Sequence, residues 1–188
     1  KDQIEGWKPV NQAVHDAGGL IIAQLWHMGR MVHSSFLGGE PPVSASPTTA
    51  PNQAHTYDGM QPYMPARALE LEEIPGIVAD YAAAARNAME AGFDGVQIHA
   101  ANGYLIDQFL RDSANLRQDE YGGSVENRIR LLCDVAQAVV DAVGADRTGV
   151  RFSPNGEVQG VRDSDPLPLF TAATKAMAQI GIAHLELK

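Results

Sequence analysis

The stretch that decides the fold runs from Gly92 to Leu110 and reads GFDGVQIHAANGYLIDQFL. Its first part, residues 95–99, is a short apolar run typical of a buried strand, and a turn at Gly103 then leads into a predicted short helix. Upstream, apolar residues between Ile74 and Met89 recur at helical spacing and stop before Gly92. At this point the chain therefore passes from helix to strand to helix.

The same alternation continues on both sides of this stretch. Glycines end the predicted helices, and Pro9 and Ser124 are residues suited to helix starts. The predicted order is helix, strand, long loop, helix, strand, helix, strand, helix, strand. The helices are expected at 9–17, 74–89, 124–143 and 170–180, and the strands at 20–25, 95–99, 148–153 and 183–187.

Strands that alternate with helices require right-handed crossovers and a parallel sheet. A Rossmann fold needs a tight glycine-rich turn after its first strand, whereas residues 26–73 form a long loop rich in Pro, Gly, Ser and Thr. We therefore predict an α/β fold of the (β/α)8 TIM-barrel class. A whole barrel takes about 250 residues, so residues 1–188 would form a single partial domain of four βα units, roughly its middle half, with 26–73 as an active-site loop.

The composition excludes several classes of function. The 188 residues include 14 Lys plus Arg and 23 Asp plus Glu, for a net charge of −9, and 45% are hydrophobic. This balance is typical of a soluble globular protein, and it predicts no binding to nucleic acid. No apolar run is long enough to cross a membrane. Cys133 is the single cysteine, so no internal disulfide can form, and the cytoplasm is the expected compartment.

Catalytic residues of an α/β barrel lie at the carboxyl ends of its strands. Gln24 and Arg151 fall near two such ends. A lone Gln there is most simply a core residue bound by backbone, but a cation within a strand must meet a carboxylate or an anionic ligand. His99, Asn102 and Tyr104 lie at and just past the end of the second predicted strand, 95–99, either as a helix-capping cluster or as a catalytic group.

No metal site is expected. The histidines at 27, 33 and 55 have no carboxylate or cysteine at a useful spacing.

Residues 93–110 and 119–128, read in one register, closely resemble the old yellow enzyme family of FMN-dependent ene-reductases. The loop segments 42–46 and 67–70 resemble that family as well. The resemblance covers essentially all 188 residues and about the middle half of a family member. It implies non-covalent FMN, NADPH or NADH as the reductant, and small electrophilic alkenes as substrates. The loops that hold the flavin phosphate in the family would follow later strands.

The resemblance also implies a role for each candidate. Gln24 would bind the pyrimidine edge of the flavin, and Arg151 would face its N1/O2 side. His99 and Asn102 would donate hydrogen bonds to the oxygen of an unsaturated carbonyl or nitro substrate. Tyr104 would give a proton to the α-carbon as the general acid.

Three alternative interpretations stay open, one for Trp26 and two for the chain as a whole. Trp26 is implied to line the substrate pocket, although an aromatic residue after a strand is often part of the core. A flavin-free aldolase or isomerase would need a Schiff-base lysine at a strand end, and only Lys188 meets that condition. The third interpretation is that the chain is an inert half-barrel fragment. Whichever interpretation holds, the expected protein partners of the chain are the remaining half of the barrel or a second copy of the chain.

Overall fold

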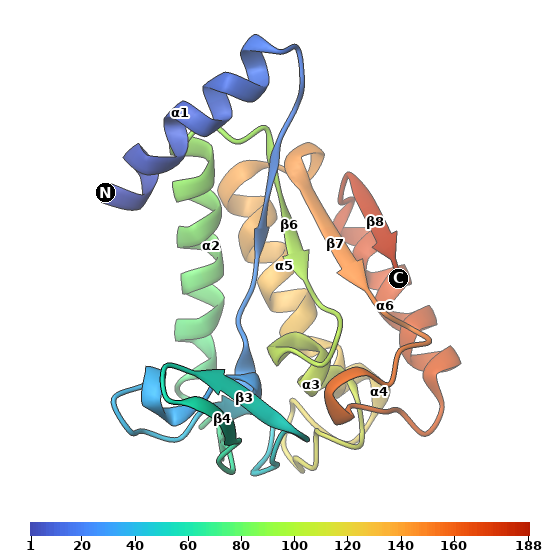
Figure 1. Ribbon diagram of the computed structural model, residues 1–188. Coiled ribbons are helices and arrows are strands. Elements are labelled where there is room, and N and C mark those ends of the chain that lie inside the picture. The colour runs from blue at the N-terminus through green and yellow to red at the C-terminus, as the bar shows by residue number, and fades with distance from the viewer.

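The computed structural model describes residues 1–188 (Figure 1). Its main helices are α1 (Asp2–Asp16), α2 (Ile74–Glu90), α3 (Leu105–Leu110), α4 (Val125–Arg128), α5 (Arg130–Val143) and α6 (Pro166–Ile180). Its strands are β1 (Ile22–Leu25), β2 (Val43–Ser44), β3 (Gln53–Thr56), β4 (Gly59–Pro62), β5 (Arg67–Ala68), β6 (Gly95–His99), β7 (Thr148–Phe152) and β8 (His184–Leu187). None of the helices is both long enough and apolar enough to span a lipid bilayer.

The central sheet has four parallel strands in the order β1-β6-β7-β8. Helices connect successive strands of this sheet, with α2 before β6, α5 before β7 and α6 before β8. α2 and α5 pack side by side (Figure 1). This is the succession of βα units expected for part of a barrel, so the predicted α/β class is confirmed. The register places Gln24 beside Gln97 and His99 beside Arg151.

The core lies between the sheet and its helices. Val96, Ile98, Val150 and Phe152 alternate along β6 and β7, are 0% exposed and belong to one hydrophobic cluster. Because successive side chains of a strand point to opposite faces, the residues between them face the other side of the sheet, the side that forms the interior in a barrel. That side is the polar one.

Three predicted helices differ from the structure. The last, predicted at 170–180, begins earlier, at Pro166, a residue type that suits the first turn of a helix. The first begins at Asp2, and Pro9 lies inside α1 rather than at its start. Asp2 and Glu5 supply acidic charge to the first turn, where the helix dipole favours it. The helix predicted at 124–143 is capped by the Ser124 side chain as expected, but it divides at Ile129 into α4 and α5.

The strand predicted to be buried at 20–25 is in fact an exposed edge strand. It is shortened to β1, and Ile22 is 46% exposed. The physical reason is that β1 has only one neighbour, β6, so its apolar side chains lack a second partner.

The loop 26–73 contains more structure than its irregular sequence indicates. β3 and β4 form an antiparallel hairpin, and β2 pairs with β5. Arg30, which is 3% exposed, fastens the loop by donating to the Thr48 hydroxyl and to the carbonyls of Gln159 and Gly160. The loop is therefore held against the segment that follows β7.

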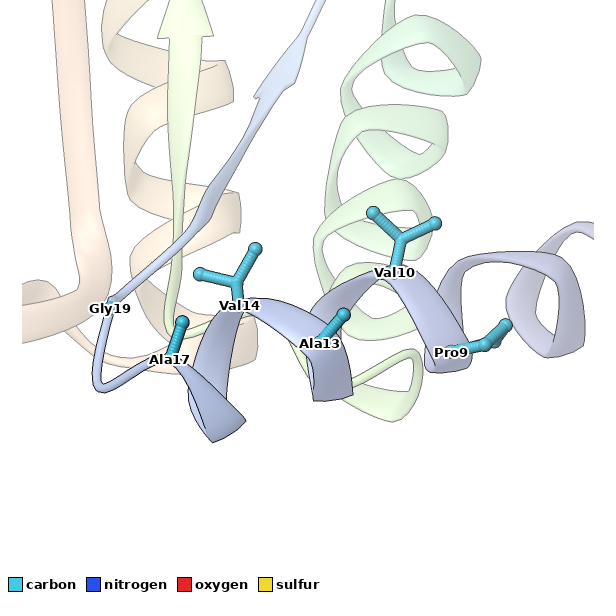
Figure 2. Close-up of a pocket in the computed structure, with 6 residues that line it drawn as sticks. All are labelled: Pro9, Val10, Ala13, Val14, Ala17 and Gly19. Carbon is cyan, nitrogen blue, oxygen red and sulfur yellow. The ribbon is translucent and has the colours of Figure 1, made fainter.

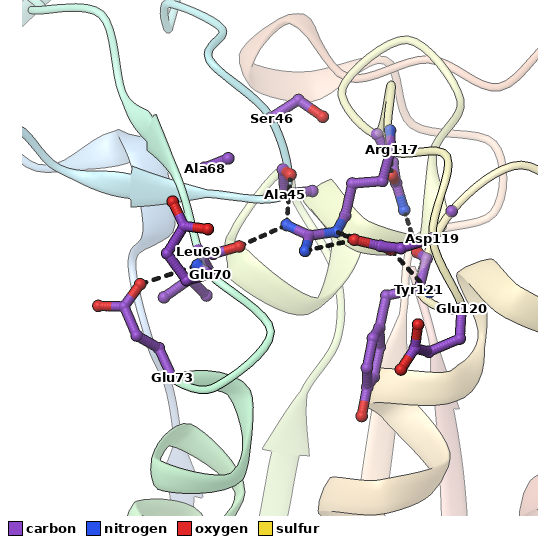
Figure 3. A network of polar contacts seen from close by, with 12 residues as sticks. Ala45, Ser46, Ala68, Leu69, Glu70, Glu73, Arg117, Asp119, Glu120 and Tyr121 are labelled. Carbon is purple, nitrogen blue, oxygen red and sulfur yellow. Dashed lines mark hydrogen bonds and ion pairs between the residues drawn. The ribbon is translucent and has the colours of Figure 1, made fainter.

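Arg117 makes a second attachment, between this loop and the segment after α3 (Figure 3). Its guanidinium donates to the backbone carbonyls of Ala45 and Leu69 at 3.1 and 2.6 Å. Asp119 pairs with the same guanidinium at 2.7 Å and accepts from the backbone N–H of Tyr121. These contacts hold the loop at Ala45 and at Leu69 against the segment that follows α3.

Candidate functional site

Three aromatic side chains from different segments meet beyond the carboxyl ends of β1 and β6. The ring centroids of Trp26 and Tyr104 lie 4.5 Å apart, those of His99 and Tyr104 5.3 Å, and those of Trp26 and His99 5.8 Å. Trp26 is 50% exposed, so it forms a wall of this cluster and is not a core residue. The structure thus brings together side chains from positions 26 and 99–104, as the sequence predicted.

His99 is buried at 5% exposure, and neither of its ring nitrogens has a hydrogen-bond partner in the protein. Burial, and then the nearby Arg151 guanidinium, lower the pKa of His99 below its usual value. The imidazole is therefore neutral at neutral pH, with one N–H donor and one acceptor available. An unpaired buried donor is costly unless a ligand meets it.

Asn102 occupies the left-handed backbone region, with φ of 56°. Its backbone N–H donates to the Ser153 hydroxyl at 2.8 Å, whereas its side-chain Oδ1 is buried without a partner. The residue that precedes α3 is Tyr104, and no side chain caps that helix. The capping interpretation of this cluster is therefore wrong, and the Asn102 amide is free to bind something else.

A buried network holds the turn that carries Asn102. The Asp107 carboxylate accepts from the backbone N–H of Gly103 at 2.8 Å and pairs with Arg111 at 2.9 Å. Arg111 then donates to the Ser153 carbonyl at 2.6 Å. The end of β7 and the start of α3 are thereby joined around the turn. Sequence reasoning missed Ser153 and this pair, although the four-residue spacing of Asp107 and Arg111 was a usable signal.

Gln24 and Arg151 are linked across the sheet. Gln24 Nε2 donates to Gln97 Oε1 at 2.6 Å, and Gln97 Nε2 donates to Glu186 Oε2 at 2.9 Å. Arg151 Nε lies 3.5 Å from Glu186 Oε1 and makes no hydrogen bond. The predicted carboxylate partner of Arg151 is thus Glu186. Gln24 is exposed and bound by a side chain, so its interpretation as a buried residue bound by backbone is wrong.

Gln97 and Glu186 were not among the site residues predicted from the sequence. A signal was present, because Gln97 stands two residues before His99 and so faces the same side of β6.

These side chains suit a flat, polar, anionic cofactor. An amide at one strand end and a cation two strands away offer hydrogen bonds and positive charge on one face of the sheet. The buried unpartnered atoms of His99, Asn102 and Arg151 lie on that face or at its end. The donors present therefore fit a flavin ring.

Two other chemistries would need either a cluster of metal ligands or a Schiff-base lysine. No three His, Cys, Asp or Glu side chains come together as a possible metal site. Lys188 is exposed at the end of β8, without the apolar surroundings that activate a Schiff-base lysine.

A separate hollow of about 670 Å³ runs along α1 (Figure 2). It is lined by Pro9, Val10, Ala13, Val14, Ala17 and Gly19, and no polar side chain lines it, so it offers no catalytic group.

The chain is similar to known flavoproteins. The family model described as NADH:flavin oxidoreductase / NADH oxidase matches residues 1–186. The structure of the old yellow enzyme homologue from Zymomonas mobilis is 60% identical, with a TM-score of 0.96, over 98% of this chain and 52% of that one. Morphinone reductase, solved in complex with tetrahydroNAD, is 42% identical, with a TM-score of 0.94, over 98% of this chain and 53% of that one.

A curated relative has a similar identity and coverage. The 12-oxophytodienoate reductase 2 of Arabidopsis thaliana is 43% identical over 190 residues, which is 100% of this chain and 50% of that protein. The chain spans about half the length of these three relatives.

Proposed function

The chain belongs to the NADH:flavin oxidoreductase / NADH oxidase family, and from this we propose that it is part of an FMN-dependent ene-reductase. The reductase takes hydride from NADPH or NADH and reduces the activated C=C bond of α,β-unsaturated carbonyl or nitro compounds. The resemblance to old yellow enzymes that the sequence indicated is confirmed by the two structural neighbours. One observation carries the proposal: the ring nitrogens of His99 and the Asn102 Oδ1 are buried and unpartnered beside Tyr104.

His99 and Asn102 are proposed to bind the substrate oxygen. Neutral His99 offers one N–H, and the Asn102 amide can turn Nδ2 inward because its carbonyl makes no hydrogen bond that would hold it. Two donors aimed at one oxygen stabilise the negative charge that develops there as the β-carbon is reduced. Ser153 supports this pair by holding the backbone of Asn102.

Tyr104 is proposed as the general acid. Its ring is packed against both Trp26 and His99, which places its hydroxyl group at the same cluster as the oxygen-binding pair. A phenol can give its proton to the α-carbon of the enolate-like substrate. Trp26 excludes water from one side of this cluster.

Gln24 and Arg151 are proposed to hold the cofactor. Bound FMN supplies the hydride chemistry, accepting from the nicotinamide and donating to the alkene. Gln24 gives the flavin an amide for its pyrimidine edge, and Arg151 gives it a permanent positive charge. Arg151 is only loosely paired with Glu186, which leaves much of its charge available.

The compartment and the protein partners are inferred from the cysteine content and from the sheet edges. We keep the cytoplasm as the proposed compartment because the chain carries a single thiol, Cys133. A second copy of the chain or a complementary barrel segment is the proposed protein partner, since the outer strands β1 and β8 each have one neighbour in the sheet.

The test is made on the holoenzyme that contains this chain. Purified protein is loaded with FMN, reduced anaerobically with NADPH or NADH, and mixed with a cyclic α,β-unsaturated ketone. The proposal predicts loss of the flavin absorbance, its return on adding the ketone, and a saturated ketone product. Flavin that the ketone does not reoxidise would contradict it. Covalent trapping of a substrate on Lys188 by borohydride would favour the aldolase reading instead.

A further inference from the structure

The side chains of Glu186, Gln97 and Gln24 form a hydrogen-bonded row. The carboxylate of Glu186 at one end determines which atom of each amide donates and which accepts. A carboxylate can only accept hydrogen bonds, so Gln97 must turn its Nε2 toward Glu186. Nε2 of His184 lies 3.2 Å from the same nitrogen, in position to accept its second N–H. Oε1 of Gln97 then faces Gln24 and accepts from the Nε2 of that residue.

The row depends on a glycine. Gln97 on β6 and Glu186 on β8 are separated by β7, where Gly149 stands beside Gln97. A Cβ at Gly149 would lie 2.1 Å from the His184 ring, so any side chain there would displace that ring. The bare backbone at 149 therefore lets groups of β8 reach Gln97.

The direction of the row determines what Gln24 presents to a ligand. Two amides facing each other could pair either way round, with the donor on either side. With Glu186 at the far end, only one arrangement avoids placing two acceptors together. In that arrangement Oε1 of Gln24 makes no hydrogen bond within the protein, and one N–H of its Nε2 also remains free.

We propose that Glu186, acting through Gln97, is a positioning residue that fixes the amide of Gln24 so that it presents one acceptor and one donor to the flavin. This rests on the proposed function. The pyrimidine edge of a flavin carries an N–H beside carbonyl oxygens, which is the complementary pattern. The reversed amide would offer that edge two N–H groups and no acceptor.

The experiment measures the affinity of oxidised FMN by fluorescence titration of the apoprotein that contains this chain. Glu186→Gln removes the acceptor-only group, so both directions of the row become possible. Affinity should fall by about three- to tenfold, as expected for one hydrogen bond. Glu186 has a side chain that is 44% exposed at a sheet edge, so the substitution spares the core.

The swapped variant Gln97→Glu with Glu186→Gln is the rescue. It places the acceptor-only group directly beside Gln24, so the original direction of that amide returns while the Arg151–Glu186 pair stays broken. Affinity should recover to within about twofold of the parent. Glu90→Gln, at the far end of α2, is the matched control and should bind FMN like the parent. In a Gln24→Met background, Glu186→Gln should have no further effect on affinity.

The outcomes separate the two proposals. Parent-like affinity in Glu186→Gln, or no recovery in the swapped variant, would overturn the positioning role while the parent still binds FMN. A parent protein that does not bind FMN would overturn the proposed function, and this inference with it.

Discussion

The two faces of β6 and β7 are made of the same strands but have opposite characters. Toward the helices, Ile98 and Phe152 are fully buried and belong to the hydrophobic core. Toward the other side, His99 and Arg151 stand next to them in sequence and carry nitrogens without hydrogen-bond partners. The interior of a barrel is usually filled by layers of branched apolar side chains.

The difference shows how stability and binding are divided within one sheet. The helix side is fully packed, so changes there act on folding. The polar side keeps buried groups unpaired, which costs stability unless a ligand satisfies them. Mutation of a residue on the helix side of a strand is therefore expected to change folding stability, whereas mutation of its neighbour on the polar side is expected to change ligand binding.

The largest expected effect on stability is at Phe152. Phe152→Ala leaves a cavity in the core and should lower the free energy of unfolding by about 3–5 kcal/mol. Arg151→Met, one residue earlier, should change it by about 1 kcal/mol or less, because its pair with Glu186 is long and partly exposed. Urea denaturation of both variants checks the contrast. Equal losses of unfolding free energy in the two variants would show that the two faces of the strand do not differ in their contribution to folding.

A smaller effect is expected on ligand binding at the other face. Phenols mimic the substrate oxyanion, and His99→Ala or Asn102→Ala should each weaken phenol binding to the FMN-loaded protein by about 1–3 kcal/mol. Spectral titration of the flavin band measures the affinity. Phenol affinity that stays at the parental value in both variants would remove the pair from the site. Phe152→Leu, on the helix side of β7, serves as the control and should bind phenols like the parent.

The pH dependence of stability should also carry the signature of His99. Because its pKa in the folded protein is lowered, the unfolded chain binds the proton first as the pH falls through about 6.5. Folding stability is therefore full above that pH and declines below it, by at most about 1.4 kcal/mol per pH unit. His99→Asn should flatten this part of the profile. A profile with the same slope in the variant would show that His99 titrates normally.

Much of the site could be predicted from sequence because its parts are close along the chain. His99, Asn102 and Tyr104 fall within six residues that begin at the last residue of β6, and a strand end in an α/β fold already marks a site. Arg151 could be selected because a cation inside a strand needs a partner. The strand at 95–99 was predicted with its exact bounds.

The remaining parts depend on which strands lie side by side. Glu186 reaches Gln97 only through the register of β6, β7 and β8, and no local pattern encodes that register. The exposure of β1 follows from its position at the sheet edge rather than from its apolar residues. The hairpin of β3 and β4 contains Gly, Gln and Pro in place of an alternating apolar pattern, so the sequence did not reveal it.

The most direct test of the central claim, that the polar face ends in a proton-donating reductase site, is stopped-flow analysis of Tyr104→Phe. The variant keeps the ring contacts with Trp26 and His99 and loses only the hydroxyl group. Flavin reduction by the nicotinamide should proceed at the parental rate, since that half needs no acid. Reduction of an enone by the reduced enzyme should slow by about 10²–10⁴-fold. Equal slowing of both halves, or unchanged enone reduction, would contradict the account.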